Sequence, residues 1–418
     1  MTQQASDSSG ASAVLAATLA RLEPVARAIG VTRLANMTGL DAIGLPIWTA
    51  IRPTSRVLAT SQGKGLCHAQ AQVSALMESI EIWHAESHCQ NLVFESPARV
   101  SAATGLPFVA PQSLAVLKNV RIANTEPILW THGRHLATDA PVLVPWEAVT
   151  LNTLTTVARR TLVMSSSGLS GGVGQWEAIL HGLCELVERY DMAGWFGWTT
   201  QQRNARRVDL AGAGGALRDV IGQVEQHCML ALWDMTGALG IPSYVCMLVD
   251  HAGADTGLEV GRCSGYATHA QAATAALRAI LEAVQARATI IAGSRDDLGE
   301  EEFEGSRDLD QSAAMRREIG AAVRGCALRA DAPLAGLAPR EAVRQLLSIF
   351  ADNGIADAYV VDLTQERFGI PVFKCVVPGL TTPSLSTIMR ELNMNRNTGN
   401  WDALFAAKAN TIAQASAT

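Results

Sequence analysis

The stretch SQGKGLCHAQAQVSALMESIE, Ser61 to Glu81, runs from small residues into a helical pattern that ends on two glutamates. Glu78 and Glu81 are three residues apart, close to one helical turn, so both carboxylates should lie on one face. Apolar residues flank the pair on both sides. Because an ionised carboxylate is costly to bury alone, the stretch raises the question of what these two side chains bind.

Two later stretches repeat the arrangement. HGLCELVERYD and LRAILEAVQAR each carry a polar pair at the same spacing, followed by an arginine: Glu185 and Glu188 before Arg189, and Glu282 and Gln285 before Arg287. The expected helices run roughly over 66–88, 175–196 and 269–292. A single pair is most simply a solvated surface pair. Three copies with few lysines at i+4 favour carboxylates that converge on a cation.

The nature of the expected cation follows from the ligands. They offer carboxylate oxygen without a Cys or His cluster, which favours Mg²⁺ held together with substrate phosphates. Two such pairs could also clamp a triphosphate. The candidate metal ligands are Glu78, Glu81, Glu185, Glu188 and Glu282.

Three strand-entry phrases also resemble one another. Each has an Asp/Thr turn, Gly-Leu-Pro or Gly-Ile-Pro, and then an apolar β-rich run: Thr38–Ile51, Asp234–Val249 and Asp362–Val377. Proline fixes φ where a strand begins and needs no ladder donor. Together with the three helices, these phrases predict an α+β fold of pseudo-repeated strand–helix modules, with helices packed on antiparallel or mixed sheets.

Small-residue segments precede the first two helices. ATSQGKG (Ala59–Gly65) and SSSGLSGG (Ser165–Gly172) are interpreted as loops that offer backbone N–H groups to an anion at a helix N-terminus. Lys64 adds a positive charge. The spacing is not that of a Walker P-loop, so the sequence predicts an ATP site of another architecture.

Composition limits the other classes of function. The 418 residues are 48% hydrophobic and 17% charged, with a net charge of −6 and no basic block, which argues against a nucleic-acid partner. No uncharged apolar run reaches about 18 residues, so no membrane span is expected. Scattered cysteines and the absence of a secretion signal favour the cytoplasm. Residues 1–12 are small and polar, and are predicted to be a disordered leader.

At this point the sequence resembles a known family. SQGKGLCHAQAQVSALMESIE, SSSGLSGGVGQWEAILHGLCELVERYD and GYATHAQAATAALRAILEAVQARATIIAGSRDD are similar, in this order, to the three signature blocks of the YcaO family. The resemblance covers roughly residues 31–380 and implies a YcaO-like catalytic domain over 13–393, followed by a helical tail over 394–418. It also implies ATP-dependent O-phosphorylation of a peptide backbone amide, which then yields an azoline, a thioamide or an amidine.

The resemblance also implies roles for residues. It places Mg²⁺ and ATP phosphates on the acidic pairs, and Arg189 and Arg287 near the phosphates as catalytic groups. The full set of expected nucleotide-binding residues is Lys64, Gly65, Ser74, Ser167, Glu78, Glu81, Glu185, Glu188, Arg189, Glu282 and Gln285. One departure is that the second block often begins Ser-Asn-Gly, where this chain has Ser166-Ser167-Gly168, which puts the contact at Ser167 in doubt.

Two phrases indicate the type of family member. MTGLDAIGLPIWTAIRP (Met37–Pro53) and VVPGL (Val376–Leu380) resemble members encoded beside a TfuA partner. That type implies thioamide formation in a ribosomally made peptide or protein, with a TfuA-like partner and an external sulfur source. The azoline-forming members usually end in a Pro-rich tail, whereas this chain ends NTIAQASAT. Azoline formation with a separate leader-binding protein is the alternative, a non-catalytic scaffold is a second one, and a homodimer is implied by the resemblance alone.

Overall fold

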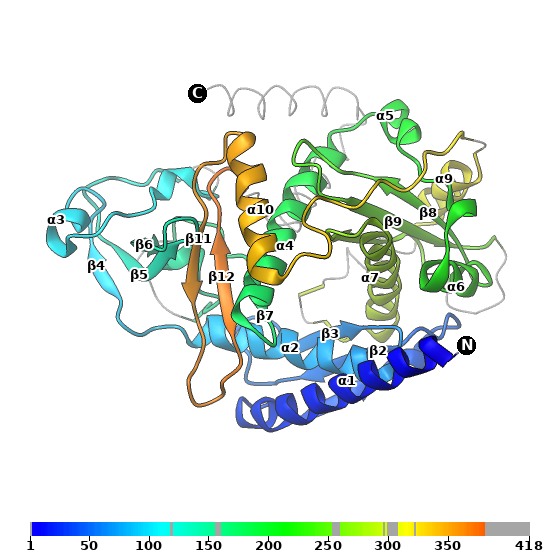
Figure 1. Cartoon of the computed structure of the whole chain (residues 1–418), viewed down its shortest axis with the longest axis horizontal. Helices are drawn as coiled ribbons and strands as arrows, with labels where there is room; N and C mark the ends of the chain where they lie inside the picture. Colours follow the sequence, from blue (N-terminus) through cyan, green and yellow to red (C-terminus); the bar gives the residue numbers. More distant parts are fainter. Residues whose placement is uncertain are drawn as a thin grey trace.

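A computed structural model of the chain describes residues 2–117, 120–154, 160–252, 260–295, 297–298, 308–321 and 323–380. The fold is α+β, as predicted, with helices packed on three antiparallel sheets (Figure 1). Three long helices, α2 (His68–Ser87), α4 (Gln175–Phe196) and α7 (Ala272–Ala292), each pack against strands of two of the sheets. The described helices include none long and apolar enough to cross a bilayer.

The first sheet lies near the N-terminus. Its strands pair in the order β1-β2-β3 and are followed by α2; the bounds are β1 Arg33–Asn36, β2 Ile47–Ile51, β3 Thr60–Lys64 and α2 His68–Ser87. The helix α1 (Thr2–Ala28) packs along α2 (Figure 1). The 1–12 segment, predicted as a disordered leader, therefore lies mostly within α1.

The second three-stranded sheet has the order β10-β9-β8 and carries α7 on one face. Its elements are β8 Cys228–Asp234, β9 Ser243–Asp250, β10 Cys263–Thr268 and α7 Ala272–Ala292. The amphipathic helix α6 (Gly215–Glu225) packs against α7 and β8, and α9 (Leu309–Gly320) packs against β8 and β9. Side chains of this sheet, α6 and α7 form one continuous buried core.

The third sheet joins distant parts of the chain in the order β4-β5-β11-β12-β7, with β6 also paired to β5. Its strands are β4 Val93–Glu95, β5 Ile128–His135, β6 Pro141–Pro145, β7 Leu169–Gly171, β11 Tyr359–Asp362 and β12 Val372–Val376. The helix α4 (Gln175–Phe196) lies on β7 and β12, and α10 (Pro339–Asp352) lies on α4. Two short helices lie in connections: α3 (Val100–Thr104) follows β4, and α5 (Thr200–Ala205) follows α4.

The three repeated phrases mark three equivalent modules, as predicted. Pro46, Pro242 and Pro371 each directly precede a strand: β2, β9 and β12. Each of these strands pairs antiparallel with a strand that leads into a long helix, namely β3 into α2, β10 into α7 and β7 into α4. In the third module, β12 comes from a part of the chain just over 200 residues beyond β7, so only folding brings its two strands together.

The small-residue segments differ from the sequence-based interpretation. Most of ATSQGKG is the strand β3, and SSSGLSGG ends in β7. In the first segment, Gly63 is required because α2 approaches closely: a Cβ there would lie 2.0 Å from the carbonyl oxygen of Ala71. In the second, Gly168 has a φ of +79° and a Cβ would lie 2.6 Å from the carbonyl oxygen of Cys375 in β12. The predicted C-terminal helical tail lies outside the described residues.

Candidate active site

The acidic pairs occupy the same position on all three central helices. Glu78, Glu185 and Glu282 each lie ten residues after the first residue of α2 (His68), α4 (Gln175) and α7 (Ala272). The second member of each pair follows three residues later. Carboxylates on different helices lie close enough to raise one another's pKa, as Glu185 does for Glu78 and Glu282 does for Glu188, so the pairs converge.

The first glutamate of each pair is held by the strand of its own module. Its carboxylate accepts a backbone N–H from the strand, or the residue before the strand, that leads into its helix: Glu78 from Gln62 (2.5 Å), Glu185 from Gly168 (3.1 Å) and Glu282 from Tyr266 (3.3 Å). A backbone donor is rigid, so each of these carboxylates has a fixed direction.

The second member of each pair crosses to the next module. Glu81 of α2 accepts from the backbone of Gly171 in β7 (2.6 Å), and Glu188 of α4 accepts from Thr268 in β10 (3.1 Å). Gln285 of α7 donates to the Gln62 side chain in β3 (3.5 Å). The contacts run from α2 to β7, from α4 to β10 and from α7 back to β3, so they close a ring of three modules.

Two cations balance part of the negative charge. Lys64 Nζ lies 2.7 Å from a Glu282 oxygen, and both side chains are partly exposed, at 24% and 30%. Arg189 lies 3.3 Å from Glu185 and 3.5 Å from Glu188. The ring therefore combines five carboxylates with two paired cations and has an excess of negative charge.

Burial and mutual repulsion make several of these carboxyls weak acids. Burial raises the pKa of Glu78 to about 6, although the Gln62 N–H opposes it. Burial also raises the pKa of Glu81 to about 8, with added repulsion from Glu78 and Glu185. The pKa of Glu188 is likewise raised by burial to about 8. Burial opposes ionisation of Glu282 too, but the charges of Lys64 and Arg189 hold its pKa below the ordinary value.

The raised pKa values of Glu81 and Glu188 predict that the ligand-free chain loses thermal stability as the pH rises from about 6.5 to about 8. At lower pH, buried histidines such as His181 and His269, whose pKa values burial lowers to about 4, act in the opposite direction. A raised carboxyl pKa means that the folded state binds the proton more tightly than the unfolded state, whose value is 4.5. The resulting stabilisation is full below the unfolded value and is lost as the pH approaches the folded one. Thermal melts without nucleotide or divalent cation, at pH 6.5 to 8, measure this slope.

Glu81→Gln is expected to flatten that slope, because it removes one of the titrating groups. Glu177→Gln is the matched control, since Glu177 is exposed in the first turn of α4. A melting temperature that rises over this pH range, or a slope that Glu81→Gln leaves unchanged, would contradict the assignment.

The ring fits Mg²⁺ bound with phosphates better than a bare metal site. Within the described ranges, no group of three or more Asp, Glu, His or Cys side chains is placed to hold a metal by itself. Mg²⁺ commonly takes only one or two protein carboxylates, and phosphate oxygens and water complete its octahedron. The oxygen-only donors and the excess negative charge match that mode of binding.

Three other predicted nucleotide-binding residues, Gly65, Ser74 and Ser167, lie at the border of the ring. Gly65 ends the β3 segment beside α2, and a Cβ there would lie 2.7 Å from the Gln70 side chain. Ser74 is half-buried one turn before Glu78. The Ser167 hydroxyl bonds to Ser165 (2.8 Å). These residues border the ring, but the described contacts give them no direct bond to its carboxylates.

Arg287 lies elsewhere, contrary to its expected place near phosphates. Its guanidinium is 2.7 Å from Asp250 and 3.7 Å from Asp41, and these side chains are all buried. Residues 282 and 285 face the ring, whereas residue 287 is turned about 200° from 285 on the helix. Arg287 therefore ties α7 to β9 and to the loop before β2, and its contacts give no support to a catalytic role.

Lys374 in β12 is a site residue that the sequence reasoning missed. It is 3% exposed, and its ammonium donates to the carbonyl oxygens of Ser165 (2.5 Å) and Ser167 (2.8 Å). Burial lowers the pKa of Lys374 to about 8, against the charge of Glu185. It fixes the segment whose Gly168 N–H binds Glu185. The sequence signal that could have identified it is a single lysine inside the otherwise apolar run VFKCVV, where a charged residue needs a specific partner.

Comparison with known proteins assigns the chain to a family. A sequence model described as YcaO cyclodehydratase, binding ATP and Mg²⁺, matches residues 62–381. An uncharacterized protein in the tfuA 3′ region of Rhizobium leguminosarum bv. trifolii is 33% identical over 385 residues, 87% of each chain. The chain belongs to the YcaO family, as its three sequence blocks predicted, and ATP and Mg²⁺ are the cofactors of that family.

Solved structures confirm the fold. YcaO from Methanopyrus kandleri, bound with AMPPCP and Mg²⁺, has a TM-score of 0.63 at 22% identity, over 85% of this chain and 87% of that one. A heterocyclase in complex with substrate and cofactor has a TM-score of 0.68 at 21% identity. The match to the heterocyclase covers 84% of this chain but only 50% of that protein, so this chain corresponds to half of it.

Proposed function

We propose that this protein activates a backbone amide of a peptide or protein by ATP- and Mg²⁺-dependent phosphorylation of the amide oxygen. The observation that carries the proposal is the closed ring of five glutamates, held by backbone N–H groups of all three modules. Such a ring is costly to keep in a protein that binds no cation, because its carboxyls repel one another. A non-catalytic scaffold would have no use for it.

The side chains divide the work by charge. Glu78, Glu81, Glu185, Glu188 and Glu282 would hold Mg²⁺, and Lys64 and Arg189 would bind phosphate oxygens, where a guanidinium can donate two hydrogen bonds. When bound, ATP supplies the phosphoryl group and Mg²⁺ neutralises its charge. The chain contributes mainly rigid positioning and electrostatic stabilisation, and the backbone-held carboxylates are suited to both.

The preferred product is a thioamide, formed with a TfuA-like partner and an external sulfur source. Support comes from the Rhizobium relative, which lies in the tfuA 3′ region and is 33% identical to this chain. In this reaction the amide oxygen leaves as phosphate and sulfur takes its place. A homodimer remains a prediction from the family resemblance.

Azoline formation with a separate leader-binding protein is the second candidate. It is favoured by the family's description as cyclodehydratases and by the likeness of fold to the heterocyclase. A Cys, Ser or Thr side chain of the peptide would then attack the activated amide carbon. Both candidates share the activation step and differ in the nucleophile.

Mass spectrometry of the peptide after reaction separates the candidates. We expect a gain of about 16 Da for exchange of oxygen by sulfur, whereas cyclodehydration removes about 18 Da; the phosphate-leaving step is common to both. ATP hydrolysis that requires the peptide should accompany either product. If no peptide-dependent ATP hydrolysis is found with every partner present, the proposal of an enzyme is contradicted and a non-catalytic scaffold becomes the better explanation.

A further inference from the structure

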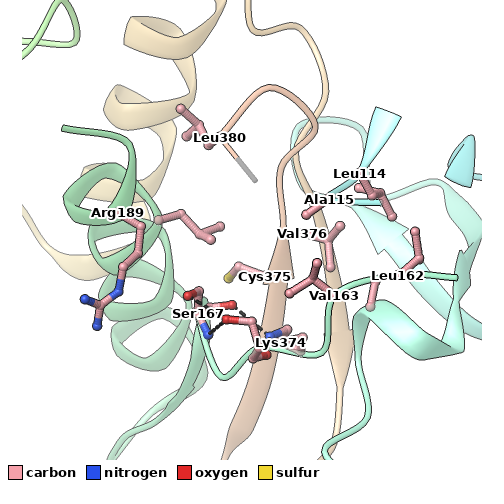
Figure 2. A pocket seen from close by; sticks show the side chains of 13 residues that line it. Leu114, Ala115, Leu162, Val163, Ser167, Arg189, Lys374, Cys375, Val376 and Leu380 are labelled. Atoms are coloured by element: carbon pink, nitrogen blue, oxygen red, sulfur yellow. Dashed lines mark hydrogen bonds between the residues drawn. The ribbon is translucent and has the colours of Figure 1, made fainter. Parts of the chain in front are cut away.

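A pocket opens beside Ser167 and Lys374 (Figure 2), and the N–H of the neighbouring Gly168 binds Glu185 of the carboxylate ring. Its cavity volume is about 40 Å³, so it is a small recess and not a cavity for a whole cofactor-sized ligand. Most of its wall is aliphatic and comes from four separate segments: Leu114, Ala115, Leu162, Val163, Val376 and Leu380. None of the functions assigned above uses this space.

The polar groups at the pocket are already bonded to protein. Lys374 donates to the carbonyls of Ser165 and Ser167 at its base, and the two serine hydroxyls bond each other (Figure 2). The Cys375 thiol lies 3.6 Å from the carbonyl oxygen of Ile179, and burial raises its pKa to about 12, so it is an unreactive thiol. A polar ligand would give up hydrogen bonds to water and find few free partners in the pocket, whereas an apolar group has no such hydrogen bonds to give up.

Two residues of the pocket wall adjoin the carboxylate ring. Arg189 borders the pocket, but its guanidinium is directed away from it (Figure 2) and pairs with Glu185 and Glu188. Ser167 lines the pocket, and the next N–H along the chain, that of Gly168, binds Glu185. A group bound in the pocket would therefore be separated from the ring only by the Ser167–Gly168 backbone.

We propose that this pocket binds an apolar side chain of the peptide substrate, from a residue adjoining the amide that is activated. The proposal rests on the proposed function and adds a preference to it. The aliphatic wall would bury that side chain, and the peptide backbone would lie toward Arg189 and the ring. Burial of one leucine-sized side chain is sufficient for a preference of ten-fold or more over glycine.

The test compares N-acetyl-leucine N-methylamide with its glycine analogue, by ligand-observed NMR titration of the full chain in the presence of AMPPCP and Mg²⁺. We expect the leucine compound to bind at least ten-fold more tightly. Ala115→Phe fills the half-buried rim of the pocket and should abolish the difference. Ala103→Phe is the matched control, because Ala103 is exposed on α3 and outside the pocket.

A second variant guards against misfolding of the first. Val163→Ala enlarges the pocket and should shift the preference from the leucine amide to N-acetyl-phenylalanine N-methylamide. Equal binding of the leucine and glycine compounds, no effect of Ala115→Phe, or displacement of the leucine amide by adenosine would overturn the proposal. Nucleotide affinity is measured in the same samples. If the unaltered chain fails to bind AMPPCP with Mg²⁺, the proposed function is contradicted. If it binds the nucleotide but shows no preference for the leucine compound, only the proposal for the pocket is contradicted.

Discussion

Glu185→Gln should weaken binding of AMPPCP with Mg²⁺ by about 100-fold or more, or roughly 2.8 kcal/mol, while the fold is retained. Glu185 accepts hydrogen bonds both from a rigid backbone donor, Gly168, and from the guanidinium of Arg189. The amide removes the negative charge that a divalent cation requires. It also frees Arg189 from part of its pairing, so that the arrangement of the neighbouring Glu188 is disturbed as well.

The fold should survive because glutamine is nearly isosteric with glutamate and its carbonyl oxygen can still accept the Gly168 N–H. Loss of one carboxylate from a mutually repelling set also relieves some strain in the ligand-free state. Isothermal titration calorimetry measures the affinity, and circular dichroism checks the fold. Glu177→Gln, on the exposed first turn of the same helix, controls for the substitution itself. Wild-type affinity in Glu185→Gln would exclude Glu185 from the site.

Much of this site could be predicted because its elements are local in sequence. Helical period and an i,i+3 pair are properties of a short stretch, so α4 was expected over the same residues that the structure gives it. Threefold repetition then indicated convergence, since one acidic pair alone is most simply a solvated surface pair. The Gly-x-Pro phrases marked β2, β9 and β12 for the same reason: the turn and the proline act on the residues next to them.

The rest depended on contacts between distant segments. Arg189 directly follows Glu188, whereas Arg287 comes two residues after Gln285. That spacing turns Arg287 to the other face of α7, where it pairs with Asp250 of β9. Lys374 belongs to the site only because β12 pairs with β7, just over 200 residues earlier in the chain. The segment before α2 was interpreted as an anion-binding loop because it is rich in small residues. In the structure, Gly63 and Gly65 are small because α2 packs directly against their backbone.

The close approach of α2 to β3 leads to the largest expected effect on stability. A Cβ built on Gly63 would lie 2.0 Å from the carbonyl oxygen of Ala71 and 2.2 Å from the backbone nitrogen of Ala75. Both obstacles are helix backbone, so no side-chain rotation can relieve the clash. We expect Gly63→Ala to destabilise the chain by about 4 kcal/mol or more, at the upper end of single substitutions.

Urea denaturation followed by circular dichroism measures this loss, as a lower midpoint or as a chain that does not fold. Gly39→Ala is the matched control, because Gly39 is exposed and a Cβ there meets nothing within 4 Å. The same contact also sets the site: it is the closeness of β3 to α2 that brings the Gln62 N–H within 2.5 Å of Glu78. If Gly63→Ala folded with wild-type stability, α2 would stand farther from β3, and the backbone support of Glu78 would be lost with it.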